Sequence, residues 1–442
     1  MQADDNAIAW ATVDLDALKA NARRLEELAQ IGEPPGNVPR DGTRVHEPTR
    51  NQTAPVHMAV VKADAYGHGL VPAATALAQA GRSVFGIAQI PEAIHLAQAL
   101  RETEVGNARI FSWLVPPTGG QQLIEHALDL GIELSVSTPQ QVLAIAATKR
   151  PARVHLKVDT GMGRAGLLPG ELEGVLAALQ QCAPRVQLVG MWSHLAKADE
   201  DTAEGKQFTA RQLEYLRQAH HEVQRAHRGI LKRTGGNSSA NLKQMGAESL
   251  SLALHLAATA GQIWHPDTRL DMVRDGIGLY GLSPNPQVET EQELGLHPAM
   301  TLNARLMQVK RIPRGWTVSY GGTWRAEQDT WIGLVPLGYA DGIARAASNR
   351  AWVRVYSQTG AWNAPVVGRI CMDQFMIKLG EGKRPPAAVG DRVVIYGDPT
   401  RTQTRGCPTA SDWAGWADTI SYEVLTRVGA RVLKCYVGGS EG

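Results

Sequence analysis

Apolar runs alternate with helix-like segments between about residue 56 and residue 282. The runs that resemble strands are HMAVV, SVFGIA, ARIFSWLV, IELSV, RVHLKV, VQLVGMWS, ILKRTG and DMVRDGIGLYG. Between them lie segments with apolar residues at helical spacing, such as PEAIHLAQALRE and TPQQVLAIAATKR. This alternation predicts a parallel sheet. About eight strands in roughly 230 residues favour an α/β fold of the TIM-type (β/α)8 barrel class over a doubly wound sheet.

The pattern changes after about residue 295, where short strand-like runs are separated by turns. Examples are TLNARLMQVKRIPRG, TWIGLVPLGYADG, AWVRVYSQTG, APVVGRICMDQFMIKLG and DRVVIYGD. Helical spacing returns only at SYEVLTRVG. We therefore predict a barrel domain over residues 12–285, followed by a mostly β C-terminal domain over residues 296–436 that includes an N-terminal strand at residues 8–14.

Two stretches fit neither pattern. Residues 31–55 are rich in proline, glycine and charge, which predicts a surface insertion without chemistry. Residues 246–267 alternate like a strand at their start and are alanine-rich like a helix later, so periodicity does not decide their structure.

Composition narrows the classes of function. The chain has 442 residues, with 45 Lys+Arg against 43 Asp+Glu and no basic run with interleaved aromatics, so we expect no nucleic-acid partner. The N-terminus has no signal-like pattern, and no apolar run is long enough to span a membrane, which predicts a cytoplasmic protein with no membrane partner. The four cysteines are widely separated, so neither a metal site nor a disulfide framework is expected.

Polar residues follow nearly every predicted barrel strand. Lys62 comes directly after HMAVV, where it is either a charge that reaches solvent over apolar surface or a reagent. Small residues around Asn237 and Ser238, and the Gly276-Ile277 turn, expose backbone N–H groups as an anion site needs. A strand-end lysine, a candidate phosphate site and no metal cluster suggest a Schiff base with pyridoxal phosphate.

At this point a family resemblance is evident. The motifs WATVDLDALKAN, AVVKADAYGHG, KVDTGMGRAG, SHLAKADE, NSS, MVRDGIGLYGL, VSYGGTW, PLGYADG, GRICMDQ and SYEV occur in this order. In combination they resemble the alanine racemases, which are barrel enzymes that use pyridoxal 5'-phosphate, over nearly the whole chain.

The resemblance implies a role for each matched residue. Lys62 is similar to the lysine that holds the cofactor and acts as one base, and Tyr320 to the opposite base. The remaining residues implied by the resemblance are the cofactor contacts Tyr66, His194, Asn237, Ser238, Arg274, Gly276 and Ile277, the substrate contacts Arg164 and Met372, and the supporting residues Lys157, Tyr339 and Asp373. Arg274 would face the pyridine nitrogen, and in some members Lys157 carries a carbamate.

The implied activity is interconversion of L-alanine and D-alanine by two bases, with D-alanine supplied for peptidoglycan. Two acid/base groups are needed because a proton leaves one face of the α-carbon and returns on the other. A homodimer with shared active sites is also implied. Two departures are visible, since Thr234 stands where many members have histidine, and Ala430 where some have a pocket-narrowing tyrosine. A broad-specificity amino-acid racemase therefore stays an alternative, as does a non-catalytic pyridoxal-phosphate protein.

Overall fold

The computed structural model describes residues 7–30, 54–103, 106, 108–168, 170–233 and 252–439. The predicted insertion at 31–55 lies almost entirely outside these residues. The chain divides into two compact units. One contains Arg23–Lys62 and Ala78–Gly276, and the other contains Met1–Ala22, Ala63–Leu77 and Ile277–Gly442. Within the described residues, no helix is both long and apolar enough to cross a membrane.

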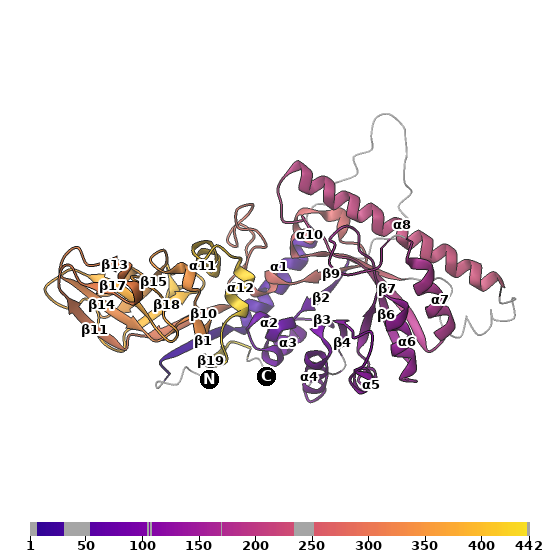
Figure 1. Ribbon diagram of the computed structural model, residues 1–442, viewed down its shortest axis with the longest axis horizontal. Coiled ribbons are helices and arrows are strands. Elements are labelled where there is room, and N and C mark those ends of the chain that lie inside the picture. The colour runs from indigo at the N-terminus through magenta and orange to yellow at the C-terminus, as the bar shows by residue number, and fades with distance from the viewer. Residues whose placement is uncertain are drawn as a thin grey trace. The chain divides into compact units, whose positions relative to one another are not determined.

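The first unit contains a closed barrel of parallel strands (Figure 1), which confirms the predicted fold class. In barrel order the strands are β2 (Val56–Val60), β3 (Val84–Gln89), β4 (Arg109–Leu114), β5 (Glu133–Val136), β6 (Ala152–Lys157), β7 (Val186–Trp192), β8 (Ala253–Ala258) and β9 (Met272–Asp275). The helices that follow strands in this unit are α4 (Ile90–Arg101), α5 (Gln121–Asp129), α6 (Pro139–Ala147), α7 (Leu172–Cys182), α8 (Ala203–Arg233) and α10 (Thr259–Trp264). Helix α1 (Leu15–Gln30) precedes β2, and α2 (Lys62–Tyr66) and α3 (Leu70–Gln79) follow it.

The barrel interior is filled by large side chains rather than by a pore. Met58, Val84, Phe111, Trp192 and Met272 form one buried cluster, each from a different strand. Alternate residues of a strand point to opposite faces, so the neighbours of these residues face the surrounding helices. Burial on both faces explains why the strands are apolar runs without strict alternation.

One predicted barrel strand is wrong. Residues 230–233 of the run ILKRTG belong to the last turn of α8, and the seventh strand is β8, Ala253–Ala258. The reason is that Leu, Lys and Arg are good helix formers and no proline or glycine pair ends the helix before them. Residues 246–267, which periodicity left undecided, contain both element types, because β8 is followed directly by α10.

The second unit is mostly β, as predicted. Its six-stranded sheet has the order β16-β15-β18-β10-β1-β19, beside a three-stranded sheet β11-β14-β17 and a hairpin β12-β13. The strands are β1 (Ala9–Asp14), β10 (Met300–Arg305), β11 (Gln308–Ile312), β12 (Thr317–Val318), β13 (Trp324–Arg325), β14 (Thr330–Val335), β15 (Trp352–Ser357), β16 (Gly360–Pro365), β17 (Phe375–Gly380), β18 (Arg392–Tyr396) and β19 (Leu433–Val437). Helix α12 (Ser421–Thr426) matches the predicted helical segment, whereas α11 (Ala410–Trp416) was not predicted.

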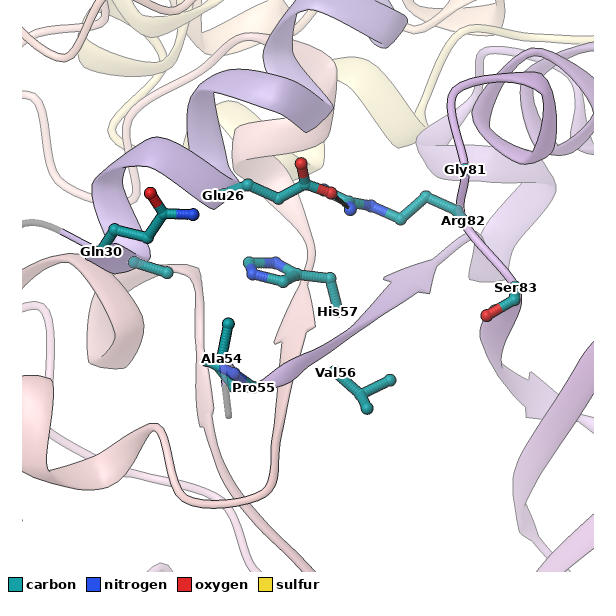
Figure 2. A pocket seen from close by; sticks show the side chains of 10 residues that line it. Glu26, Gln30, Ala54, Pro55, Val56, His57, Gly81, Arg82 and Ser83 are labelled. Atoms are coloured by element: carbon teal, nitrogen blue, oxygen red, sulfur yellow. Dashed lines mark hydrogen bonds and ion pairs between the residues drawn. The ribbon is translucent and has the colours of Figure 1, made fainter. Parts of the chain in front are cut away.

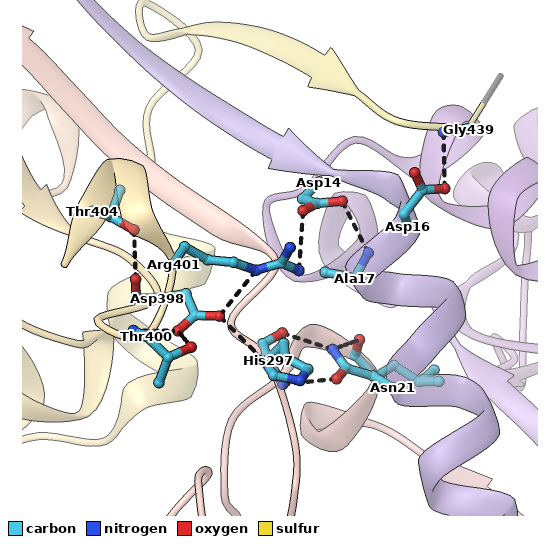
Figure 3. A network of polar contacts seen from close by, with 11 residues as sticks. Asp14, Asp16, Ala17, Asn21, His297, Asp398, Thr400, Arg401, Thr404 and Gly439 are labelled. Atoms are coloured by element: carbon cyan, nitrogen blue, oxygen red, sulfur yellow. Dashed lines mark hydrogen bonds and ion pairs between the residues drawn. The ribbon is translucent and has the colours of Figure 1, made fainter.

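The N-terminal strand β1 is hydrogen-bonded to a neighbouring strand of this sheet on each of its two sides. β1 pairs antiparallel with β10 and parallel with β19. Asp14 then caps α1, because its carboxylate accepts the Ala17 N–H at 2.9 Å. The same carboxylate forms an ion pair with Arg401 at 3.4 Å, and Arg401 also pairs with Asp398 at 3.4 Å. Figure 3 shows Arg401 between the two carboxylates. The start of α1 is thereby joined to the loop after β18.

Candidate active site

Basic and polar side chains gather at the carboxyl ends of the barrel strands, where barrel enzymes carry their active sites. They come from β2, β6, β7, β8 and β9, either in the strand itself or within two residues of its end. In chain order they are Lys62, Lys157, His194, Thr259 and Arg274. Four of these were predicted from the sequence, and the fifth, Thr259, was not.

Lys62 lies in a partly buried and cationic environment. Its Nζ is 5.8 Å from the centre of the Trp113 ring. The pKa of Lys62 is lowered, mainly by burial and then by the positive charge of Arg164. Glu92 acts in the opposite direction, and Arg274 adds a smaller lowering. A lower pKa increases the fraction of neutral amine, which is the form that acts as a nucleophile or a base. This environment favours a reagent over a charge that simply reaches solvent.

Arg274 is a buried cation held by four acceptors. Its Nη2 donates to Ser193 O at 2.8 Å, Leu256 O at 2.9 Å and His194 Nδ1 at 3.1 Å. Its Nη1 donates to His255 Nδ1 at 3.2 Å. Burial lowers the pKa of Arg274 to about 9, so the group is still charged at pH 7. Among the described residues, no acceptor takes a hydrogen bond from its Nε–H.

His194 and Lys157 adjoin the same cation. Burial, followed by the charges of Arg274 and Arg164, holds the pKa of His194 well below its usual range, so the ring is neutral at pH 7. Since His194 Nδ1 accepts from Arg274, its hydrogen is on Nε2. The Lys157 Nζ lies 4.3 Å from the centre of the Trp192 ring. Burial and Arg164 lower the pKa of Lys157 to about 8.

Arg164 is exposed on the loop after β6. The loop is fixed by the Asp159 carboxylate, which accepts N–H bonds from Gly161, Met162 and Gly163 at 2.9, 2.9 and 3.1 Å. A guanidinium on a loop fixed in this way is suited to binding a carboxylate.

The segment after β2 is a left-handed turn. Ala63, Asp64, Ala65 and Tyr66 all have φ between 53° and 55°. A non-glycine residue in this conformation costs roughly 1–2 kcal/mol, and such strain is concentrated at functional sites. The Asp64 carboxylate helps to hold the turn by accepting the Leu70 N–H at 2.7 Å.

Tyr66 and Ile277 are buried within the second unit. The Tyr66 ring stacks on that of Tyr280 with 4.6 Å between ring centres, and burial raises the pKa of its phenol. Ile277 begins the 3-10 helix Ile277–Tyr280. Tyr66 therefore belongs to a buried aromatic stack.

A hydroxyl and a backbone N–H meet at the ends of β8 and β9. The Gly276 N–H donates to Thr259 Oγ1 at 3.1 Å, and Thr259 is 2% exposed. Asn237 and Ser238, which were predicted for this function, lie outside the described residues, as does Thr234. A strand-like start followed by a helix-like end in residues 246–267 was the signal that could have located Thr259, because a hydroxyl at such a junction is suited to an anion site.

Tyr320 lies on a conformationally strained loop of the second unit and is 71% exposed. The preceding residue, Ser319, has φ 61°, and Gly321 has φ 70°. The Ser319 hydroxyl fixes the loop by donating to Arg369 O at 2.6 Å. The loop therefore presents the phenol outward from its own chain.

Tyr339, Met372 and Asp373 lie on two loops of the same unit that are hydrogen-bonded to each other. The Tyr339 N–H donates to Cys371 O, and the Ala340 N–H to Met372 O, both at 3.0 Å. Tyr339 is 45% and Met372 53% exposed. Asp373 accepts a hydrogen bond from Arg431 at 2.9 Å.

A cavity of about 300 Å³ lies at the opposite, amino-terminal end of the barrel strands. Figure 2 shows His57 and Arg82 among its lining side chains. His57 Nδ1 is 2.9 Å from the Asp275 carboxylate, which Arg82 approaches to 3.3 Å. This cavity is separate from the strand ends that carry Lys62. No group of three or more potential metal ligands is present among the described residues.

Two family models match the chain. "Alanine racemase, N-terminal domain" matches residues 47–253, and "Alanine racemase, C-terminal domain" matches residues 299–436. The chain belongs to the alanine racemase family. Among its relatives, the alanine racemase of Beutenbergia cavernae is 41% identical over 439 residues, which is 98% of this chain and 99% of the relative. That of Thermobifida fusca is 38% identical over 98% of this chain and 99% of its own length.

Solved structures of the family have the same fold. The alanine racemase of Streptomyces coelicolor A3(2) superposes with a TM-score of 0.79 at 36% identity, covering 99% of this chain and 100% of that one. The enzyme from Streptomyces lavendulae gives a TM-score of 0.78 at 36% identity, covering 98% of each chain.

Alanine racemases depend on pyridoxal phosphate, and the described residues fit that cofactor. Lys62 supplies an amine with a lowered pKa for the aldehyde. Arg274 has an Nε–H that no described residue uses, as a hydrogen bond to a pyridine nitrogen requires. Thr259 places a buried hydroxyl, which accepts the Gly276 N–H, at the strand ends where a phosphate would bind.

Proposed function

We propose that this protein is an alanine racemase that interconverts L-alanine and D-alanine with pyridoxal 5'-phosphate, using Lys62 and Tyr320 as the two bases. Full-length membership of the family supports the activity. The observation that carries the chemistry is the position of Lys62 at the end of β2, with its Nζ 5.8 Å from the centre of the Trp113 ring, in a barrel whose other strand ends hold Arg274 and His194.

When bound, pyridoxal phosphate supplies an electron sink for the negative charge left on the α-carbon. Lys62 would hold the cofactor and would remove or return a proton on one face of the α-carbon. Arg274 would donate to the pyridine nitrogen, and because it is a cation that cannot accept a proton, it keeps that nitrogen unprotonated. Arg274 would thereby favour racemisation over side reactions.

The phosphate would be held by Tyr66, the Gly276 and Ile277 backbone, and a hydroxyl at a strand end. Ser238 and Asn237 were predicted for that position from the sequence, and Thr259 adds a buried candidate beside Gly276. A Thr259→Val variant tests the choice between them. Weaker retention of the cofactor, measured by equilibrium dialysis, would support Thr259, and unchanged retention would favour Ser238.

The substrate carboxylate would be bound by Arg164 and by the backbone at Met372, and Lys157, Tyr339 and Asp373 would support these contacts. Tyr320 would act on the opposite face with a hydrogen bond from His194, whose Nε2–H is free to donate because its Nδ1 accepts from Arg274. The predicted β domain, residues 296–436, would supply Tyr320 to the site of a partner subunit, which makes the protein a homodimer. The exposure of Tyr320, Tyr339 and Met372 in the single chain supports this arrangement. On family membership alone, we further propose a cytoplasmic location and a role in supplying D-alanine for peptidoglycan.

The activity is tested by measuring racemisation over a panel of amino acids after the purified protein is loaded with pyridoxal phosphate. We expect alanine to be the best substrate. Comparable rates on several amino acids would favour a broad-specificity racemase instead, and cofactor uptake without turnover would favour a binding protein.

The identity of the lysine has its own test. Borohydride reduction of the loaded protein, followed by peptide mapping, should leave the cofactor on Lys62, because it is an amine of lowered pKa at a strand end. The nearby Lys157 is a built-in comparison, since its pKa is also lowered. A label on Lys157 would refute the assignment.

A further inference from the structure

A chain of buried side chains crosses the barrel interior from β5 to β9. The Glu133 carboxylate Oε2 is 2.9 Å from His155 Nε2. His155 Nδ1 is 2.9 Å from His255 Nε2, and His255 Nδ1 is 3.2 Å from Arg274 Nη1. The exposure is 4% or less for all four residues. The sequence offered a partial signal, because His155 and His255 lie next to apolar residues within the strand-like runs RVHLKV and ALHLAA.

The hydrogen positions along this chain follow from Arg274. A guanidinium only donates, so His255 Nδ1 must accept and its hydrogen must be on Nε2. His255 Nε2–H then donates to His155 Nδ1. Because His155 Nδ1 accepts, the ring hydrogen of His155 is on Nε2. His155 Nε2–H donates to Glu133. Each donor therefore meets an acceptor, and both rings are neutral with one tautomer.

The charges are consistent with these tautomers. Burial lowers the pKa of His155, and burial holds that of His255 well below its usual range, so neither ring is charged at pH 7. Burial alone would raise the pKa of Glu133, but hydrogen bonds from His155 and Arg109 hold it far below its usual range. Glu133 is therefore the ionised end of the chain. Among the described residues, no carboxylate bonds Arg274 directly.

We propose that Glu133 and His155 are positioning residues for the cofactor, which act on Arg274 through His255. This rests on the proposed function, in which Arg274 faces the pyridine ring. The Glu133 charge polarises the His155 N–H, which makes His155 Nδ1 a stronger acceptor for His255 and His255 Nδ1 a stronger acceptor for Arg274. The buried guanidinium is thus kept charged and in one orientation without a carboxylate beside it.

A purely structural role would give a different result. If the network only fills the barrel, a substitution that keeps its shape should change neither cofactor affinity nor the absorption of the bound cofactor. Glu133→Gln keeps the shape of the side chain, and its amide oxygen can still accept from His155 Nε2–H while the charge is lost. The amide NH2 then replaces the Oε1 that accepts from Arg109 Nε at 3.2 Å and Arg153 Nε at 2.9 Å, so the control must also lose an acceptor for arginine. Asp129→Asn is the matched control, since it removes an arginine-paired carboxylate, 2.7 Å from Arg150, that has no link to Arg274.

The experiment measures the dissociation constant of pyridoxal phosphate and the visible absorption and circular dichroism of the loaded protein. For Glu133→Gln we expect about 10-fold weaker cofactor binding, the lower end for loss of an outer supporting partner, and a displaced visible band. Asp129→Asn should match the wild type. If Glu133→Gln also matches it, the proposal is overturned.

A second measurement uses the wild-type protein, so it does not require any variant to fold. Nitrogen-15 NMR of histidine-labelled wild-type apoprotein should show His155 and His255 as neutral Nε2–H tautomers. An imidazolium, or an Nδ1–H tautomer at His155, would overturn the chain of donors. If the wild type takes up no cofactor at all, the proposed function fails and this inference fails with it. An unchanged Glu133→Gln variant in a protein that does bind cofactor overturns the positioning role alone.

Discussion

Lys62 and Tyr320, the two bases of the proposed function, lie in different environments. Lys62 is partly buried near Trp113, and burial together with Arg164 lowers its pKa. Tyr320 is 71% exposed, on a loop fixed by Ser319 and by residues of positive φ. The pKa of Lys62 is therefore lowered by its own barrel, whereas most of the Tyr320 side chain is uncovered. In the proposed function the remaining environment of Tyr320 comes from a partner subunit.

Tyr320→Phe tests the two-base proposal. The cofactor should still bind, because Lys62 and Arg274 are unchanged, but racemisation should fall by at least about 100-fold in both directions, as expected for loss of a general base. Exchange of the α-proton with solvent should survive better on one enantiomer, because Lys62 still acts on its face. The assay compares rates from L-alanine and from D-alanine with proton exchange followed by NMR.

Tyr356→Phe is the control for this variant, since it removes a phenol hydroxyl from β15, a strand of the six-stranded sheet of the same unit. It should racemise alanine at the wild-type rate. Near-normal racemisation by Tyr320→Phe in both directions would leave the VSYGG loop with a structural role only.

At the scale of elements, the turn Ala63–Tyr66 stores strain next to Lys62. Four consecutive residues have positive φ, and Asp64 supports them through Leu70 and an ion pair with Lys434. The strain is tolerated because the contacts of Asp64 with Leu70 and Lys434 hold the turn in this conformation.

Replacement of alanine by glycine should have opposite effects on the free energy of unfolding at two positions, one in the left-handed turn and one in α1. Ala63→Gly should stabilise the protein by about 0.5–1 kcal/mol, because glycine adopts φ 55° without the Cβ penalty. Ala20→Gly, at an exposed position in α1, should destabilise it by about 1 kcal/mol, since glycine is a poor helix former. Urea unfolding of both variants measures the two values. A loss of stability in Ala63→Gly as large as in Ala20→Gly would contradict the left-handed turn.

For the whole molecule, buried neutral histidines couple folding to pH. Burial lowers the pKa of His68 to about 4 and also lowers that of His155, His194 and His255. Between the unfolded and folded pKa values, the unfolded chain binds protons that the folded chain does not. Their contribution to stability is therefore complete above about pH 6.5 and is lost as the pH falls.

We expect the urea midpoint of the apoprotein to fall steadily from pH 7 to pH 4. His68 alone should account for about 3 kcal/mol of this loss, from a pKa difference of about 2.5 units. His68→Gln, whose amide can still donate to the Ala65 and Tyr66 carbonyls, should flatten the pH dependence. His95→Gln, at an exposed position, should not. Equal slopes in the wild type and His68→Gln would contradict the buried neutral ring.

The proposed dimer is tested by mixing two inactive variants. Lys62→Ala lacks one base and Tyr320→Phe the other, so in shared sites a mixed dimer regains one complete site. After subunit exchange, about a quarter of all sites should be complete and activity should recover accordingly. Each variant alone, treated in the same way, is the control. No recovery after demonstrated exchange would mean that each chain supplies its own pair of bases.

Much of the fold and part of the site could be predicted from local pattern. The barrel class and the β-rich second unit follow from the spacing of apolar residues, because burial of one face repeats at the period of each element. The strand-end positions of Lys62, Lys157, His194 and Arg274 could be predicted because these residues follow apolar runs, and their roles stay predictions. The order of motifs supplied the family, and with it the expectation for Tyr320.

Other features depended on tertiary structure. The apolar run at residues 230–233 is compatible with a strand, and only closure of the barrel shows that β8 fills the seventh position. The left-handed turn after Lys62 has no sequence signature, since alanine and aspartate usually avoid that conformation. Glu133, His155 and His255 are up to 122 residues apart, and their hydrogen bonds exist because the barrel brings β5, β6 and β8 together. The period of apolar residues depends only on neighbours in the chain, so it can be read from the sequence. The hydrogen-bond partners of a buried polar group come from strands that meet only when the barrel closes.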